Sequence, residues 1–190
     1  DYIIEQLMAN DLLLELDMSK IPNAKNIAPR MMEFTNGFDP GNKYSLPYMW
    51  GTVGILYNTT MVDEEVDSWD ILWNEKYSGK IWQYDSIRDA IAVSLLRLGY
   101  DINTRNEAEV EEAKNELIKQ IPLLKGKGTD NIRNFMINNR DALAVVYSGD
   151  ALACCDENEN LAYVVPKEGS NVWFDNVVIP KTAKNVEAAH

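Results

Sequence analysis

The stretch Asn171-Val172-Trp173-Phe174-Asp175-Asn176-Val177-Val178-Ile179-Pro180 decides how the rest of the sequence is interpreted. Most of its residues are β-branched or aromatic and Pro180 ends the run, so it predicts a β-strand. Side chains alternate along a strand, so Trp173 and Asp175 are expected on one face and Phe174 on the other. An indole beside a carboxylate suits an organic cation. The alternative, in which Trp173 is a core residue and Asp175 a turn residue, stays open from this stretch alone.

Charge and composition limit the classes of function. The 190 residues carry 18 basic and 30 acidic side chains, for a formal net charge of −12. Such a charge repels nucleic acids and attracts cations, so we expect no nucleic-acid partner. The single histidine, His190, is the last residue, which argues against histidine triads and imidazole metal sites, and we expect no metal and no cofactor. Cys154 and Cys155 are adjacent and are expected to be free thiols.

Apolar spacing predicts strands that alternate with helices. Strands are expected at residues 12–16, 45–50, 52–58, 79–84, 142–147, 161–166 and 171–180. Helices are expected at residues 2–9, 27–33, 69–73, 86–98, 105–120 and 131–139 and from residue 149 onward, with a loop at 126–130. This alternation predicts an α/β sandwich with a mostly parallel sheet. Ligands of such sheets bind beyond the carboxyl ends of the strands.

Two aspartates flank a serine where the strand through Trp82 gives way to a helix. Ser86 and Asp89 have the spacing of a capping box, in which the Ser86 side chain caps the helix and the Asp89 side chain accepts a hydrogen bond from the backbone N–H of Ser86. A role for Asp85 and Asp89 in binding a cation is an equal alternative, because two carboxylates would reverse the positive potential of a helix N-terminus.

The same arrangement recurs at Tyr147-Ser148-Gly149-Asp150, where an apolar strand ends in an aromatic residue and an acid opens the next helix. Taken separately, Tyr147 is equally well a core residue and Asp150 an N-cap. Together with Trp173 and Asp175, three strand ends offer an aromatic ring, a carboxylate or both. On one edge of a sheet they would form a slot for a chain that bears several ammonium groups, whose methylenes pack on the rings.

Short motifs in order over nearly all of the chain carry a family resemblance. They are Asp1-Tyr2, Phe38-Asp39-Pro40, Tyr44-Ser45-Leu46-Pro47-Tyr48-Met49-Trp50-Gly51, Ser68-Trp69-Asp70-Ile71-Leu72-Trp73, Asp85-Ser86-Ile87-Arg88-Asp89, Leu98-Gly99-Tyr100, Tyr147-Ser148-Gly149-Asp150, Val165-Pro166-Lys167-Glu168-Gly169 and Trp173-Phe174-Asp175. In this order they resemble the spermidine/putrescine-binding family, the extracytoplasmic solute receptors of bacterial polyamine ABC transporters.

The resemblance implies a periplasmic-binding-protein-like (type II) fold, in which two α/β lobes joined by crossover strands close on the ligand. It assigns residues 1–51 and 176–190 to a truncated first lobe and residues 52–175 to a complete second lobe. Trp173 and Asp175 then belong to the polyamine slot, and Tyr2 falls where the family places a ligand-contacting tyrosine.

The resemblance also implies ligand contacts in the second lobe. Tyr147 stands where the family often has tryptophan, and Asp150 resembles an acid found in putrescine-preferring relatives. Asp89 aligns with a family carboxylate that is often glutamate. Ser86 replaces an acid present in some members, with Asp85 beside it.

By the same resemblance, the family's opening strand and its C-terminal portion lie outside these 190 residues, so the sequence is interpreted as a fragment. Missing strands would expose apolar surface and sheet edges, which favours a homodimer of the fragment through its first lobe. We expect the isolated chain to bind polyamine weakly or not at all. The expected partners are a polyamine, spermidine or putrescine, and the permease subunits of an ABC transporter, at an extracytoplasmic location.

Three alternative functions stay open. The first is a receptor for another small organic solute, because related receptors share one architecture. The second is a hydrolase that uses Asp85 and Asp89 as a carboxylate pair, although no nucleophile or acid–base partner accompanies them. The third is a structural or interaction domain. A binding protein without enzymatic activity is the leading prediction.

Overall fold

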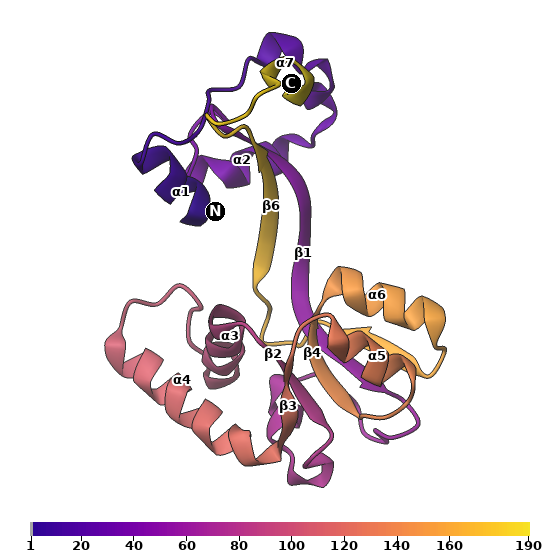
Figure 1. The fold of residues 1–190 in the computed structure, drawn as a ribbon. Coiled ribbons are helices and arrows are strands. Elements are labelled where there is room, and N and C mark those ends of the chain that lie inside the picture. Colours follow the sequence, from indigo (N-terminus) through magenta and orange to yellow (C-terminus); the bar gives the residue numbers. More distant parts are fainter. Residues whose placement is uncertain (1) are drawn as a thin grey trace. The chain divides into compact units, whose positions relative to one another are not determined.

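The chain divides into two compact units in the computed structural model, which describes residues 2–190. Unit 1 comprises Asp1–Trp50 and Trp173–His190, and unit 2 comprises Gly51–Val172. Two paired strands, β1 (Ser45–Asn58) and β6 (Val172–Val178), each contain residues of both units (Figure 1). The two strands predicted on either side of Gly51 are therefore one continuous strand.

Unit 2 is built on a mixed sheet whose strands lie in the order β3 (Leu124–Gly128), β2 (Ile81–Tyr84), β4 (Leu143–Tyr147), β1 and β5 (Leu161–Val164). Strand β2 runs parallel to β4, as predicted, and also parallel to β3. Strand β1 runs antiparallel to β4 and β5, with Val53 opposite Tyr147. The prediction of a mostly parallel sheet therefore fails at β1, because this strand enters the sheet at the edge where β4 ends.

The predicted loop at residues 126–130 is wrong for residues 126–128, because residues 124–128 form β3 and pair with β2, and is confirmed for the turn at residues 129–130. The glycines of this strand are explained by packing. A Cβ built on Gly126 would lie 2.9 Å from the Trp82 ring, closer than real Cβ contacts. Gly126 thus allows the indole of Trp82 to lie against the neighbouring strand.

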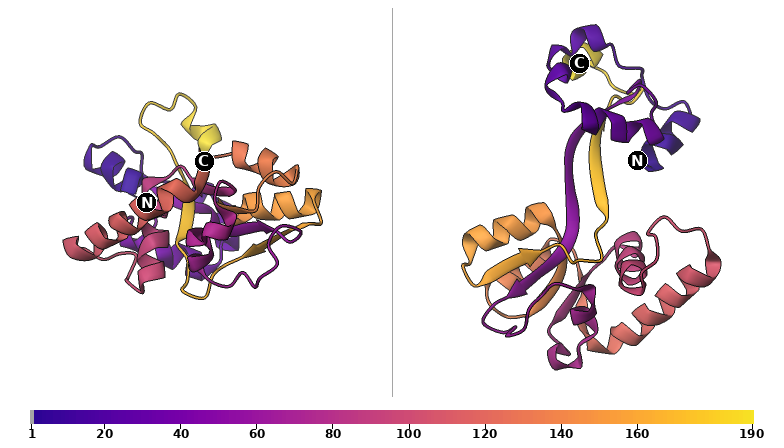
Figure 2. Two further views of the ribbon diagram at one scale, coloured as in Figure 1. Left: turned by 90° about the horizontal axis from the view of Figure 1, so that it is seen from below. Right: turned by 180° about the vertical axis from the view of Figure 1, so that it is seen from behind.

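Helices cover both faces of this sheet (Figures 1 and 2). On one face lie α3 (Ile87–Leu98) and α4 (Glu107–Gln120), which pack against each other. On the other face lie α5 (Asn131–Ile137) and α6 (Ser148–Glu157), which close a core of buried residues: Leu56, Trp82, Ile132, Met136, Ala144, Val146, Ala151, Cys154 and Leu161. The predicted α/β sandwich is confirmed.

Helix α3 begins and ends where the sequence predicts. Ser86 is its N-cap and accepts a hydrogen bond from the backbone N–H of Asp89. Gly99 ends the helix with a left-handed φ of 80°, a conformation that glycine adopts without strain. The predicted helix at residues 69–73 forms as a 3-10 helix, η4 (Trp69–Trp73), and is followed by two more in this unit, η5 (Glu75–Tyr77) and η6 (Ile121–Leu123).

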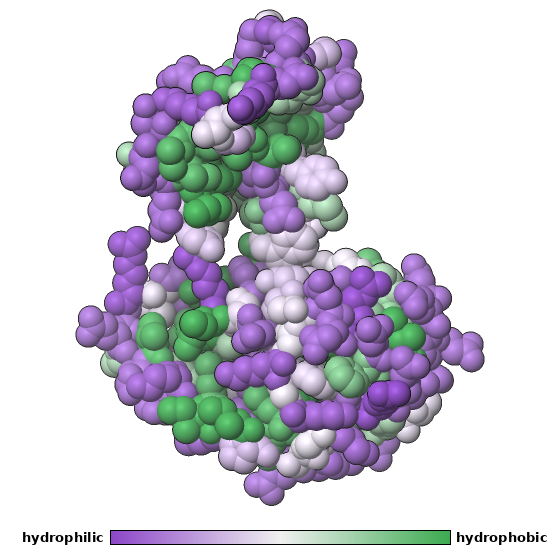
Figure 3. All heavy atoms as spheres, viewed as in Figure 1, coloured by the Kyte–Doolittle hydropathy of each residue, from purple (hydrophilic) through white to green (hydrophobic). Residues whose placement is uncertain are grey.

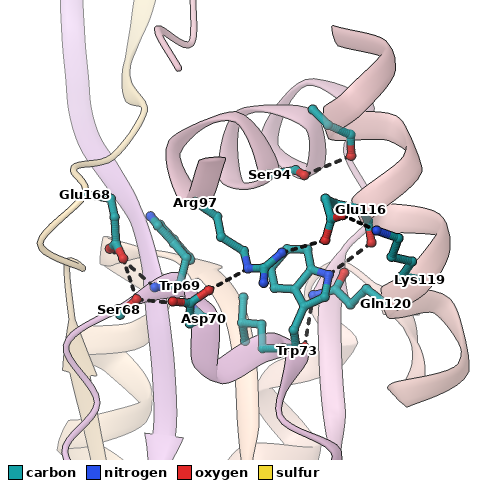
Figure 4. A network of polar contacts seen from close by, with 12 residues as sticks. Ser68, Trp69, Asp70, Trp73, Ser94, Arg97, Glu116, Lys119, Gln120 and Glu168 are labelled. Carbon is teal, nitrogen blue, oxygen red and sulfur yellow. Dashed lines mark hydrogen bonds and ion pairs between the residues drawn. The ribbon is translucent and has the colours of Figure 1, made fainter. Parts of the chain in front are cut away.

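A polar network ties η4 to α3 and α4 (Figure 4). The Arg97 guanidinium lies 4.4 Å from the Trp73 ring centre, and it contacts Asp70 at 2.7 Å and Glu116 at 2.8 Å. The Trp73 indole N–H donates to the Glu116 carbonyl at 3.0 Å. Ser68, the N-cap of η4, also hydrogen-bonds Glu168. The network joins η4 to α3 and α4 within unit 2.

Unit 1 consists of short helices around its share of β1 and β6. These are α1 (Tyr2–Ala9), η1 (Met18–Lys20), η2 (Pro22–Asn26), α2 (Pro29–Phe34), η3 (Thr35–Gly37) and α7 (Val186–Ala189). The predicted strand at residues 12–16 is wrong, since only an isolated bridge joins Leu13 to Pro180. The pairing stops on both sides of this bridge because Leu16 donates its N–H to the Lys43 carbonyl instead, and because the chain turns after Pro180, whose carbonyl accepts from the Ala183 N–H.

Buried Asp39 organises the turn that leads into β1. Its carboxylate accepts hydrogen bonds from the backbone N–H groups of Lys43, Tyr44 and Ser45 and from the Ser45 hydroxyl, at 2.8–3.1 Å. A carboxylate with four donors is well compensated for its burial. The Phe38-Asp39-Pro40 motif is thus a structural element of unit 1.

Apolar side chains are exposed on unit 1 (Figure 3). Tyr48, Met49 and Trp50 of β1 are 71%, 51% and 57% exposed. They line a groove of about 170 Å³ together with Ile27, Met31, Pro47 and Phe174. No helix among residues 2–190 has the length and apolar character required to cross a membrane.

Candidate functional site

Two tyrosines stand at the carboxyl-end edge of the unit 2 sheet. Strand β2 ends at Tyr84 and its parallel neighbour β4 ends at Tyr147. Their rings lie 4.6 Å apart, centre to centre, at an interplanar angle of 56°. This edge is where ligands of open α/β sheets bind, and it carries two partly exposed aromatic faces.

Asp89 connects this edge to the segment that leads into β6. The Tyr147 hydroxyl donates to Asp89 Oδ2 at 2.8 Å, and the Asn171 amide donates to Asp89 Oδ1 at 2.9 Å. Asp89 is only 4% exposed. The capping interpretation is therefore correct for Ser86 but not for Asp89, whose carboxylate contacts Tyr147 and Asn171.

Asp150 lies in the first turn of α6, and the N-cap of that helix is Tyr147. The N-cap alternative for Asp150 is therefore wrong. Its carboxylate instead pairs with Arg133 of α5 at 3.5 Å.

The negative charges of three carboxylates affect the pKa of the Tyr84 hydroxyl. Burial raises the pKa of the Tyr84 hydroxyl, and the negative charges of Asp150, Asp130 and Asp89 raise it further. The edge therefore combines two aromatic rings with a negative potential, which is the combination that attracts an organic cation.

Asp85 lies next to this edge. It is exposed and lines a cavity of about 160 Å³ that Tyr84 also lines, with Gln83, Ser86, Leu117, Lys127 and other residues of α3. Its backbone N–H donates to the Gly128 carbonyl at 2.8 Å. Asp85 thus lines the cavity, Asp89 is bonded to Tyr147 and Asn171, and Ser86 caps α3.

The other predicted residues belong to unit 1. Trp173 is partly exposed and Asp175 is exposed on β6, while Phe174 packs on Phe34 with ring centres 4.9 Å apart. Tyr2, in α1, is 49% exposed. Trp173, Asp175 and Tyr2 are therefore positioned by unit 1, and Tyr147, Asp89, Ser86, Asp85 and Asp150 by unit 2.

Sequence reasoning missed three residues at the unit 2 edge: Tyr84, Asp130 and Asn171. Tyr84 ends a predicted strand, as Tyr147 does, so the same sequence pattern marks it. Asp130 follows β3, which was predicted to be a loop. No local pattern marks Asn171, because its partner Asp89 lies 82 residues away.

Neither a cluster of metal-ligating side chains nor a disulfide is present in the described part of the chain. No group of three or more His, Cys, Asp or Glu side chains among residues 2–190 is arranged to hold a metal ion. Cys154 and Cys155 are free thiols, and burial raises the pKa of both, which disfavours the reactive thiolate.

Comparison with known proteins gives consistent matches. A family model described as bacterial extracellular solute-binding protein matches residues 2–190. The chain is 35% identical over 191 aligned positions to the spermidine/putrescine-binding periplasmic protein 1 of Haemophilus influenzae, covering 100% of this chain and 52% of that protein.

Two solved structures have the same fold. The spermidine/putrescine ABC transporter substrate-binding protein of Streptococcus pneumoniae superposes with a TM-score of 0.85 at 46% identity, over 99% of this chain and 58% of that one. A Listeria monocytogenes protein assigned to spermidine/putrescine ABC transport gives a TM-score of 0.92 at 44% identity, over 100% and 58%. The chain thus spans a little more than half the length of these relatives.

Proposed function

Because this chain belongs to the bacterial extracellular solute-binding protein family, we propose that it is the solute-capturing component of an ABC importer for polyamines. The relatives named above are described as binding or transporting spermidine and putrescine. The observation that carries the proposal is the edge of unit 2, where the Tyr147–Asp89 hydrogen bond lies beside the Tyr84 ring.

Polyamine recognition requires rings for the methylenes and carboxylates for the ammonium groups. The unit 2 edge supplies Tyr84 and Tyr147 as rings and Asp89, Asp130 and Asp150 as acids. Each cation–π contact stabilises a bound ammonium by about 0.5–2 kcal/mol, depending on desolvation. Asp89, with both carboxylate oxygens already bonded, would mainly orient Tyr147 and add negative potential.

Unit 1 would supply the second set of contacts, in which Trp173 and Asp175 place an indole and a carboxylate on one strand and Tyr2 adds a ring. In this proposal the two units are the two lobes of the family, with Trp173 and Asp175 in the first lobe and not in the second as the resemblance implied, and the lobes close on the ligand and exclude water. The support for it is the family resemblance and the exposure of Asp175 and Tyr2.

A titration of the 190-residue chain followed by two-dimensional NMR tests the proposal. Because the chain spans about half of its relatives, we expect weak binding, which NMR detects and calorimetry reports as no tight complex. Spermidine should shift the signals of Tyr84, Tyr147 and Asn171 in a saturable manner. Tight one-to-one binding by calorimetry would overturn the expectation of weak binding, and absence of any saturable shift would overturn the polyamine site.

The alternative is a receptor for another small organic solute, which the shared architecture allows. Thermal-shift ranking of spermidine, putrescine, an amino acid and a sugar separates the two. The hydrolase alternative is not retained, because the family binds solutes and both oxygens of Asp89 accept hydrogen bonds from Tyr147 and Asn171.

The proposed setting follows from the family. We propose an extracytoplasmic location, either periplasmic or anchored at the cell surface, and delivery of the ligand to the permease subunits of the transporter. The exposed Tyr48, Met49 and Trp50 support the proposal that the isolated chain forms a homodimer through unit 1. Sedimentation velocity of Trp50→Ser beside the unmodified chain tests it: a dimer that the substitution dissociates supports it, and a monomer throughout excludes it.

A further inference from the structure

Arg133 pairs with two carboxylates on one face of α6. Asp150 and Glu157 are separated by two helical turns, so their side chains share this face. The Arg133 guanidinium lies 3.5 Å from the Asp150 carboxylate and 3.8 Å from the Glu157 carboxylate.

The two ion pairs of Arg133 are loose. Both are longer than the roughly 2.7–2.9 Å of a charge-assisted hydrogen bond. The side chains of Arg133 and Asp150 are 36% and 30% exposed, so solvent reaches the pair. Exposed ion pairs of this kind are weak and easily exchanged.

Asp150 lies in the first turn of α6, whose N-cap is Tyr147, so it follows the proposed site directly in the fold. Its negative charge is one of those that raise the pKa of the Tyr84 hydroxyl. A cation that binds at the Tyr84 and Tyr147 rings would therefore meet Asp150 with a guanidinium already beside it. Arg133 places one positive charge where the proposed ligand would place another.

We propose that Arg133 is an internal competitor for Asp150, which lowers the affinity of the site for polyamines and yields Asp150 to a ligand ammonium while Glu157 retains the guanidinium. This inference rests on the proposed function, and it assigns to Arg133 a role in setting affinity that requires no contact with the ligand.

Substitutions at Arg133 test the competition through NMR titrations with spermidine and with putrescine. Arg133→Gln should tighten binding about two- to fivefold, the factor that corresponds to one exposed ion pair. Arg133→Lys keeps the charge and should bind like the unmodified chain. Arg105→Gln, an exposed site in unit 2, removes the same charge elsewhere and should change affinity less.

Two further variants locate the effect at Asp150. Asp150→Asn should weaken binding, and adding Arg133→Gln to it should produce no gain. Glu157→Gln removes the second carboxylate that pairs with Arg133, so Arg133 should hold Asp150 more strongly and spermidine should bind more weakly. This variant tests the competition even if Arg133→Gln does not fold.

The possible failures are distinct. If the unmodified chain binds spermidine but Arg133→Gln and Glu157→Gln leave affinity unchanged, the competition is refuted and the proposed function stands. Equal losses in Arg133→Gln and Arg133→Lys would show a structural role and also refute it. If neither the unmodified chain nor any variant binds either polyamine, the proposed function fails and this inference fails with it.

Discussion

The Tyr147 hydroxyl donates a 2.8 Å hydrogen bond to Asp89 Oδ2, joining the end of β4 to the first turn of α3 across 58 residues of sequence. Asn171 occupies the other oxygen of the same carboxylate. One buried acid thus fixes the aromatic residue of the proposed site and the segment that leads into β6.

Removing the Tyr147 hydroxyl should weaken both the site and the unit. Tyr147→Phe keeps the ring but leaves an oxygen of buried Asp89 without its donor. Hydrogen bonds to charged groups contribute about 1.5–3 kcal/mol, so we expect a loss of unfolding free energy of about that size in urea denaturation. Spermidine affinity should fall as well, because the ring loses its orientation.

Tyr100→Phe is the matched control for this change. Its hydroxyl also donates to a carboxylate, Glu112, at 2.7 Å, but on the exposed surface of α4. A smaller loss of stability and unchanged spermidine binding are expected. Equal effects of the two substitutions would show that the Tyr147–Asp89 bond has no special role.

Asp175 on β6 tests the contribution of unit 1. Asp175→Asn removes an exposed charge on the strand that carries Trp173 and should weaken spermidine binding in an NMR titration. Glu109→Gln removes a charge from α4, where Glu109 contacts Thr104 and Asn106, and should have less effect. If the two substitutions weaken binding equally, the unit 1 contacts are misplaced.

Gln83 offers a stabilising substitution. It is 2% exposed, and neither atom of its side-chain amide has a hydrogen-bond partner among the described residues. Burying such an amide costs about 1–3 kcal/mol in proteins, so Gln83→Leu should raise the free energy of unfolding in urea denaturation by an amount of that order.

Gln120 is the control, because it is equally buried but donates to the Leu72 carbonyl at 3.3 Å. Gln120→Leu should therefore destabilise the protein. A destabilising effect of Gln83→Leu would contradict this prediction.

Glu116 gives the protein an acid-sensitive contact. Hydrogen bonds from Lys119 and Arg97 hold the pKa of Glu116 below its ordinary value of 4.5. Because the folded pKa lies below the unfolded one, this stabilisation is present above the unfolded pKa and is lost as the pH falls through the folded pKa. In urea denaturation, Glu116→Gln should lose less unfolding free energy than the unmodified chain when the pH falls below 4.5. Glu159→Gln, at an exposed loop position, is the control and should lose as much as the unmodified chain.

The sequence pattern predicts most of the elements and part of the site. Strand ends at Tyr147 and near Tyr84 follow from apolar runs that stop at polar residues, and parallel pairing brings them to one edge. The antiparallel pairing of β1 could not be predicted, because the apolar residues of a strand do not indicate whether its neighbours run parallel or antiparallel to it. Strand β3 was not predicted, because glycines in a short segment are typical of a loop. Gly126 is required here because the Trp82 ring of a neighbouring strand leaves no room for a Cβ, and this contact cannot be recognised from the local sequence.

The partners of the acids were equally hidden. Ser86 and Asp89 have capping spacing, yet only the folded chain brings Tyr147 and Asn171 to the Asp89 carboxylate. Likewise Asp150 resembles an N-cap in sequence, and its pairing with Arg133 depends on the packing of α5 on α6.

The most direct test of the proposed polyamine site is the NMR titration of the 190-residue chain with spermidine, read at the residues of the unit 2 edge. Spermidine should cause saturable shifts of Tyr84, Tyr147 and Asn171 that are reduced in Tyr147→Phe and retained in Tyr100→Phe. Shifts spread evenly over the acidic surface of α4, with none at the two tyrosines, would contradict it.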